Sequence, residues 1–174
     1  MSARCPICQG QHKLLKGNPL AVERATAARL ARTFQKVPSR LWRRRPKRGE
    51  WSMVEVLAHL ADAEVAFAFR LRKMVSEPRP TLVTWDQEAW ATGLRYNRRD
   101  PRGLLATFRA LRDSNLAILR ALPRARWSLV GRHPEYGPIR VDQLVAHYAE
   151  HDLNHLNQLG ETGARIRQAS RARR

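Results

Sequence analysis

Apolar residues recur at intervals of three and four positions in four segments of the chain, and this spacing is typical of amphipathic helices. The predicted helices cover residues 20–37, from Ser52 to Pro78, from Asp100 to Pro123, and residues 141–159. Ser52 followed by Glu55 forms a capping box, and Asp100 before Pro101 places an N-cap ahead of a first-turn proline. No segment shows a convincing strand pattern. The pattern therefore predicts an all-α fold, a four-helix bundle with a long connection between its second and third helices.

Two of the connections between these helices have features of their own. Residues 78–100 are long for a connection and contain Trp85, Trp90 and Tyr96. A connection of this length often covers a site, and the alternative is a crossover strap whose tryptophans fill the end of the bundle. Residues 131–137 contain two glycines, a proline and His133, so this segment is predicted to be a turn rather than a strand.

The composition indicates one globular domain. The chain has 174 residues, 43% of them hydrophobic, which suffices for one sizeable core and not for two. No apolar run approaches the length of a transmembrane helix, and no apolar segment follows the N-terminal lysines, so neither a membrane span nor a signal peptide is expected. Two cysteines imply no disulfide framework, and a cytoplasmic location is the default expectation.

The chain is strongly basic, because 33 Lys and Arg stand against 15 Asp and Glu and give a formal charge of +18. This excess favours acidic partners such as nucleic acid. The densest run includes Arg43, Arg44 and Arg45. It is interpreted either as an exposed loop or as a phosphate-binding patch with Trp42 available for stacking.

Both ends of the chain lie outside the predicted bundle, which covers residues 20–162. Residues 1–19 are expected to form an N-terminal extension, either flexible or a weak zinc knuckle built from Cys5, Cys8 and His12. A structural zinc site needs four ligands, and no fourth is evident nearby. Residues 163–174 are expected to form a disordered basic tail.

Three histidines follow one another at four-residue intervals in the last predicted helix: His147, His151 and His155. Residues four apart lie on one face of a helix, and at this spacing two imidazoles can share a metal ion. His151 and His155 fall within the apolar stripe, so they are predicted to point into the bundle. They are then either metal ligands or core residues that each need a hydrogen-bond partner. If they are ligands, the third comes from another helix, and His59 is the best candidate.

Two segments resemble the DinB-like, or YfiT-like, family of candidate metalloenzymes. They are Glu50-Trp-Ser-Met-Val-Glu-Val-Leu-Ala-His59-Leu and His151-Asp-Leu-Asn-His155-Leu-Asn-Gln158. The Gly-x-His-Pro-Glu-Tyr-Gly loop is similar to one branch of the family, and the resemblance extends over residues 20–160. It implies a four-helix bundle in up-up-down-down order, often dimeric, with a three-histidine site for a divalent metal, usually zinc or nickel. Carried over by position, the metal ligands are His59, His151 and His155.

The residues and the resemblance together predict a metal-dependent hydrolase or thiol transferase that acts on a small molecule, through a metal-bound water or thiol. The residues predicted to line the site or support its ligands are His147, Asp152, Trp85 and Tyr148. No catalytic residue is selected. The candidate general bases are Glu150, Asp152, Glu64 and Asp62, and of these Asp152 is expected to brace a neighbouring helix rather than to act on substrate. The alternatives are a nucleic-acid-binding protein and a structural protein stabilised by its metal.

Overall fold

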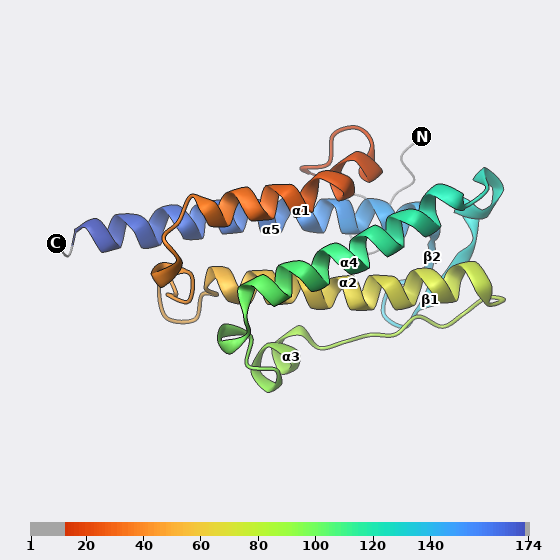
Figure 1. The fold of residues 1–174 in the computed structure, drawn as a ribbon. Coiled ribbons are helices and arrows are strands. Elements are labelled where there is room, and N and C mark those ends of the chain that lie inside the picture. Colours follow the sequence, from red (N-terminus) through yellow and green to blue (C-terminus); the bar gives the residue numbers. More distant parts are fainter. Residues whose placement is uncertain (1–12, 173–174) are drawn as a thin grey trace.

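The computed structural model describes residues 13–172, which form a bundle of four long helices (Figure 1). The bundle helices are α1 (Pro19–Gln35), α2 (Met53–Ser76), α4 (Pro101–Ala121) and α5 (Val141–Arg171). A short helix, α3 (Gln87–Gly93), lies in the connection between α2 and α4, and a hairpin of β1 (Val130–His133) and β2 (Gly137–Arg140) precedes α5. Short 3-10 turns occur at Ser39–Leu41, Tyr96–Arg98 and Arg124–Ser128. The predicted four-helix bundle is confirmed, whereas Cys5, Cys8 and His12 lie outside the described residues.

The directions of the helices differ from the expected order. α1 and α5 run parallel, as two contacts show. Leu15 before α1 contacts Glu150 in the first half of α5, and Lys36 after α1 contacts Arg167 near the end of α5. α2 and α4 run the opposite way (Figure 1). The order is therefore down-up-up-down, and the expected up-up-down-down order is wrong. A compact connection turns the chain back after α1, whereas the long connection after α2 returns it to the end of the bundle where α2 began.

α2 is the central helix of the fold. It begins at the predicted capping box, in which the Ser52 hydroxyl accepts from the Glu55 backbone N–H at 3.2 Å and the Glu55 carboxylate accepts from the Ser52 N–H at 2.8 Å. Eighteen of its 24 residues are buried. A helix that faces solvent on one side would bury far fewer, so α2 is enclosed by α4, α5, the hairpin and the long connection.

The hairpin is a correction to the prediction of a turn without strands. β1 and β2 pair antiparallel from Val130 opposite Arg140 to His133 opposite Gly137, and Gly137 adopts a φ of 72° that suits glycine in a tight turn. The connection after α2 adds to the edge of β1, since the Leu82 N–H donates to the carbonyl of Arg132 at 2.8 Å. Strands of four residues are too short to give a clear alternating pattern, which is why they were not expected.

The extent of α5 is a second correction. The helix continues past residue 159, where it was expected to end, through Gly160 and Gly163 to Arg171, so the predicted disordered tail is helical up to Arg171. A Cβ at Gly163 would lie 2.9 Å from a methyl group of Val37, and Ile166 is 1% exposed. Gly163 therefore allows α5 to approach the end of α1 closely, and Ile166 extends the core beyond the predicted end of the helix.

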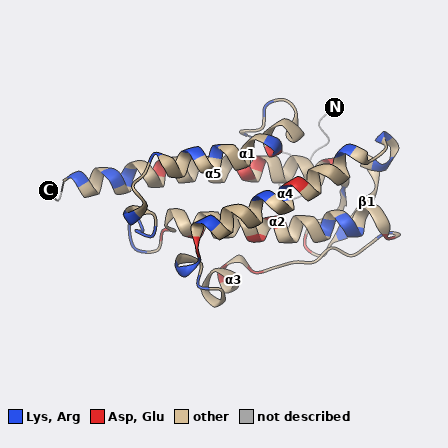
Figure 2. Ribbon diagram, in the orientation of Figure 1, with Lys and Arg blue, Asp and Glu red and all other residues tan. Residues whose placement is uncertain are grey.

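The Lys and Arg residues are spread over all the bundle helices and several connections (Figure 2). Two arginines of the run from Arg43 to Arg45 make hydrogen bonds within the fold. Arg43 donates to the carbonyl of Arg99 at 3.0 Å, and Arg45 donates to the carboxylate of Glu55 at 3.1 Å. These contacts favour a structural loop over a phosphate-binding patch. No helix within residues 13–172 is long and apolar enough to cross a membrane.

Candidate metal centre

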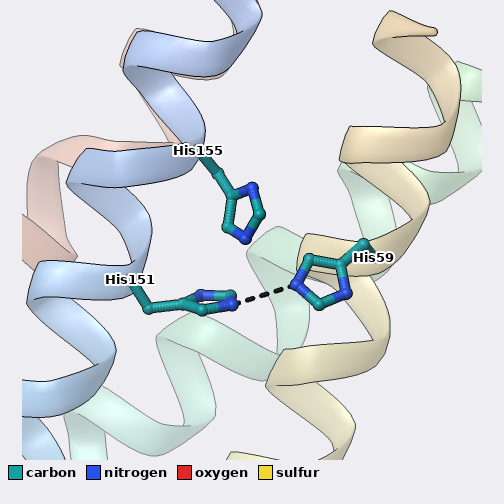
Figure 3. Close-up of side chains that lie close together, drawn as sticks. All are labelled: His59, His151 and His155. Carbon is teal, nitrogen blue, oxygen red and sulfur yellow. Dashed lines mark hydrogen bonds between the residues drawn. The ribbon is translucent and has the colours of Figure 1, made fainter. Parts of the chain in front are cut away.

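Three histidines from two helices meet between α2 and α5 (Figure 3). His59 lies in the second turn of α2, and His151 and His155 lie on successive turns of α5. The ring centroids are 5.0 Å apart for His59 and His151, 4.6 Å for His59 and His155, and 4.4 Å for His151 and His155. One ring nitrogen of each lies within 4.8 Å of those of the other two. The convergence predicted from the sequence is therefore present, although 92 positions separate His59 from His151.

The ring nitrogens are placed as ligands of one ion would be. Nε2 of His59 and Nε2 of His151 are 3.0 Å apart, near the roughly 3.3 Å expected between nitrogens about 2.0 Å from a shared tetrahedral ion. Nδ1 of His155 lies 2.7 Å from Oε1 of Gln158. A proton on that Nδ1 leaves the lone pair of His155 on Nε2, which faces the other two rings.

The alternative of ordinary core histidines fits less well. Nδ1 of His59 and Nδ1 of His151 are buried and have no hydrogen-bond partner within residues 13–172. A core histidine kept for packing would have both nitrogens satisfied, whereas a hydrogen bond across the 3.0 Å between the two Nε2 atoms satisfies only one nitrogen of each ring. A cation bound between the two Nε2 atoms would stabilise the same arrangement of the rings.

The environment keeps these imidazoles neutral. Burial lowers the pKa of His59 to about 3, with a further contribution from His155. Burial also lowers the pKa of His151 well below its usual range, assisted by the neighbouring histidines, and it lowers the pKa of His155. All three rings are therefore uncharged at neutral pH and carry the lone pairs that metal ligation needs.

The connection between α2 and α4 covers this cluster. The Trp85 ring stacks on the His59 ring at a centroid distance of 5.4 Å and an angle of 26°, and Trp90 packs against Trp85 at 4.8 Å. α3 begins directly after this contact, where its N-cap Asp86 accepts from the backbone N–H groups of Glu88 and Ala89. Of the two interpretations of the tryptophan-containing connection, the structure favours the one that covers a site.

Two further residues expected to line the site lie close to His151. The His147 ring is 6.3 Å and the Tyr148 ring 6.1 Å from that of His151. The Tyr148 hydroxyl accepts from Nη1 of Arg70 at 3.2 Å, and burial raises its pKa to about 12. Tyr148 is therefore a protonated, buried residue behind His151 at neutral pH.

The acidic residues considered as general bases are each held by partners outside the histidine cluster. Asp152 pairs with Arg112 at 2.7 Å and so braces α4. The Glu64 carboxylate pairs with the same guanidinium at 2.8 Å. The carboxylate of Glu150 accepts from the N–H groups of Leu14 and Leu15, and that of Asp62 pairs with Arg99. The structure thus selects no base from among these four carboxylates.

Two cavities adjoin the cluster. One, of about 280 Å³, is bounded by His59, His151 and His147 and extends to Arg70 and His133. The other, of about 430 Å³, lies on the His155 side and is bounded by Gln158, Glu50 and Glu161, among others. Sequence reasoning missed Arg70 and His133 as cavity residues. The only signal for His133 was the glycine-rich loop, whose folding into a hairpin was not foreseen.

The chain is similar in sequence to bacterial proteins named as candidate metal-dependent hydrolases. It is 30% identical over 108 residues to OB0782 of Oceanobacillus iheyensis, an alignment that covers 62% of this chain and 62% of that protein. It is 26% identical over 119 residues to YfiT of Bacillus subtilis, covering 68% of this chain and 67% of that protein. The aligned part thus spans less than two thirds of the first relative.

Solved structures show the same fold. The structure of Bacillus subtilis YfiT, described as an unusual four-helix bundle, matches with a TM-score of 0.80 at 22% identity and covers 94% of this chain and 97% of its own. A mycothiol-dependent maleylpyruvate isomerase matches with a TM-score of 0.67 at 14% identity, covering 82% of this chain and 59% of its own. The sequence model of the DinB superfamily matches residues 23–159, most of the chain. The chain therefore belongs to the DinB superfamily.

Proposed function

We propose that this protein is a divalent-metal-dependent enzyme of the hydrolase or thiol-transferase type, and that His59, His151 and His155 bind the ion. The observation that carries the proposal is the meeting of three neutral imidazoles, one buried and two partly buried, with two Nε2 atoms 3.0 Å apart. The names of the sequence relatives support the hydrolase type. An all-imidazole donor set suits zinc or nickel better than magnesium or calcium, which prefer oxygen ligands.

His59, His151 and His155 would hold the ion, and the ion would supply the Lewis acidity that lowers the pKa of a bound water or thiol. The remaining contributions come from the chain itself. Gln158 orients His155 through the 2.7 Å contact with its Nδ1, and the Asp152–Arg112 pair fixes the turn of α5 that carries His151. Trp85 covers His59 and limits the access of bulk water.

The metal proposal is tested by elemental analysis of the purified protein and of His59→Gln and His155→Gln variants. The wild type is expected to hold close to one zinc or nickel equivalent per chain and the variants much less. Cobalt substitution, followed by addition of a small thiol, then separates the two reaction types, since thiolate ligation changes the absorption spectrum. A wild-type protein that takes up no divalent metal on reconstitution would contradict the proposal.

A second candidate function is binding of nucleic acid. A cleft of about 330 Å³ at the far end of α5 is lined by Lys36, Arg40, Arg167 and Arg171, with no acidic side chain among its lining residues. Such a cleft could hold a phosphate group. Binding of this kind should weaken steeply with salt and persist after metal chelation, whereas turnover of a small molecule should stop on chelation.

Three further statements are proposals of their own: that the metal is purely structural, that the protein is a homodimer, and that it is cytoplasmic. A structural metal should raise the melting temperature without any turnover. For dimerisation, the exposed apolar side chains of Val65 and Phe69 on α2 offer a contact surface. Sedimentation of the wild type and of a Phe69→Ser variant would test whether that surface is used.

A further inference from the structure

We propose that the cavity of about 280 Å³ beside the histidines is an anion-binding subsite, in which Arg70 and His133 hold a carboxylate of the substrate. Its role as a substrate subsite rests on the proposed metal-dependent activity. Arg70 and the metal-site histidines border the same cavity, so one molecule can reach both. A volume at the low end of the range for ligand pockets indicates a small molecule.

Arg70 is a buried cation without a buried counterion. Arg70 is only 6% exposed, yet it forms no ion pair within residues 13–172. Nε and Nη2 donate to the carbonyl of Val83 at 3.0 and 2.7 Å, and Nη1 donates to the Tyr148 hydroxyl at 3.2 Å. Arg112, the other deeply buried arginine, pairs with two carboxylates. A buried guanidinium that keeps its charge uncompensated beside a cavity favours an anionic occupant.

The contact between Arg70 and His133 strengthens this assignment. Nδ1 of His133 accepts from the backbone N–H of Glu135 at 3.2 Å, so a neutral ring carries its proton on Nε2. Burial and the nearby Arg70 lower the pKa of His133, which keeps the ring neutral. That Nε2 lies 3.4 Å from Nη2 of Arg70, so two N–H donors face each other with no acceptor between them. A carboxylate oxygen placed between the two donors would satisfy both.

The position of Arg70 on α2 aims it toward the metal site. Arg70 follows His59 by 11 residues, about three helical turns, so both lie on the same face of α2. Long side chains on a helix lean toward its N-terminal end, which brings the guanidinium back toward His59. Tyr148 connects Arg70 with the histidine cluster, since its hydroxyl accepts from Arg70 and its ring lies 6.1 Å from that of His151. A substrate carboxylate at Arg70 would therefore leave the rest of the molecule directed at the imidazoles.

The rest of the cavity wall is compatible with an anion. Thr84 and Gln87 add neutral polar side chains, His147 adds an imidazole ring, and Trp85 adds an aromatic wall. The one acidic residue of the wall, Glu135, is exposed, and its charge is screened by water more than that of a buried group. Of the two charged residues that line the cavity, the cation Arg70 is buried and the anion Glu135 is exposed, so the buried charge beside the cavity is positive.

Binding of benzoate and of its neutral isostere benzamide, measured by calorimetry on metal-loaded and on chelator-treated protein, tests the subsite. Benzoate should bind at least about tenfold more tightly than benzamide in both preparations, because a charge-assisted hydrogen bond to Arg70 and His133 is lost with the amide. Arg70→Gln and His133→Leu should each weaken benzoate binding, the first by about tenfold or more. Arg72→Gln is the matched control, since Arg72 lies on α2 outside the cavity and contacts Ser114, and it should bind benzoate like the wild type.

Two outcomes would overturn the subsite. The first is equal binding of benzoate and benzamide by the wild type, which requires no variant to fold. The second is unchanged benzoate binding in both Arg70→Gln and His133→Leu. Inorganic phosphate is tested in parallel, and tighter binding of phosphate than of benzoate would replace the carboxylate by a phosphate group and so contradict the class assigned here. Metal content, measured separately on the same samples, reports on the metal proposal alone, so the two failures are distinguishable.

Discussion

Asp152, the residue that follows His151, accepts a 2.7 Å hydrogen bond from Nη1 of Arg112 in the interior of the bundle. Nη2 of the same guanidinium donates to Glu64 at 2.8 Å, and Nη1 also donates to the backbone carbonyl of Glu23 at 2.8 Å. These contacts join all four bundle helices at one point. Because Asp152 is covalently next to His151, the network fixes the part of α5 that carries the histidine cluster.

Replacing Arg112 by Met should therefore destabilise the protein strongly. The change leaves the carboxylates of Glu64 and Asp152 buried without a cation, and breaking a buried pair in this way costs about 3–5 kcal/mol. Urea denaturation followed by circular dichroism measures the free energy of unfolding. Arg72→Met, at an exposed position of α2, serves as the control and should cost about 1 kcal/mol or less. Equal stability of the two variants would show that the network is not important for folding.

The Glu23→Gln variant should change how stability depends on pH. Burial raises the pKa of Glu23 well above its usual range, Arg112 opposes this, and Asp152 and Glu64 add to it. The folded state therefore holds this proton more tightly than the unfolded chain. As pH rises from the unfolded pKa, about 4.3, toward the raised folded pKa, this group makes the free energy of unfolding fall.

Glutamine cannot titrate, so Glu23→Gln should lack this fall in the free energy of unfolding with rising pH. The difference in stability between Glu23→Gln and wild type should grow with pH over this interval and level off above the folded pKa. Denaturation at a series of pH values measures it. The exposed Glu161 provides the control, since Glu161→Gln should shift the curve little. A Glu23 variant with the same pH profile as the wild type would mean that this carboxyl is ionised in the folded protein.

The sequence was sufficient to predict the features that depend on local spacing. The helices and the Ser52–Glu55 capping box follow from periodicity and motif. The approach of His59 to the α5 pair is a long-range contact, and it was expected from the need for a third ligand and from the family resemblance. The hairpin and Arg70 could not be predicted in this way. The four-residue strands depend on pairing with each other and with Leu82, and the role of Arg70 depends on contacts with two other elements. The direction of the helices is likewise set by how each connection crosses the bundle.

The end of α5 also provides a test, because Ile166 was expected to lie in a disordered tail. Ile166 is 1% exposed and belongs to the core, so Ile166→Ala should lower the free energy of unfolding by about 2–4 kcal/mol. Removal of the chain from Arg165 onward should also destabilise the protein, which removal of a disordered tail would not do. Arg171→Ala changes an exposed residue of the same helix and should have an effect within about 0.5 kcal/mol. Thermal unfolding compares the three variants. A loss of less than about 2 kcal/mol for Ile166→Ala would show that the last turns of α5 contribute little to stability.

His147 and His151 provide the sharpest comparison for the metal site, because both are histidines on α5 that border the same cavity. His151 has its Nε2 3.0 Å from that of His59. His147 lies two helical turns before His155, about 12 Å along the axis. One ion therefore cannot be bound by His147, His151 and His155 together. After a brief chelator challenge, His151→Gln should retain little metal, whereas His147→Gln should retain nearly as much as the wild type. Elemental analysis gives the retained metal, and circular dichroism confirms that both variants are folded. Equal metal loss in the two variants would instead identify His147 and His151 as the binding pair and remove His155 from the site.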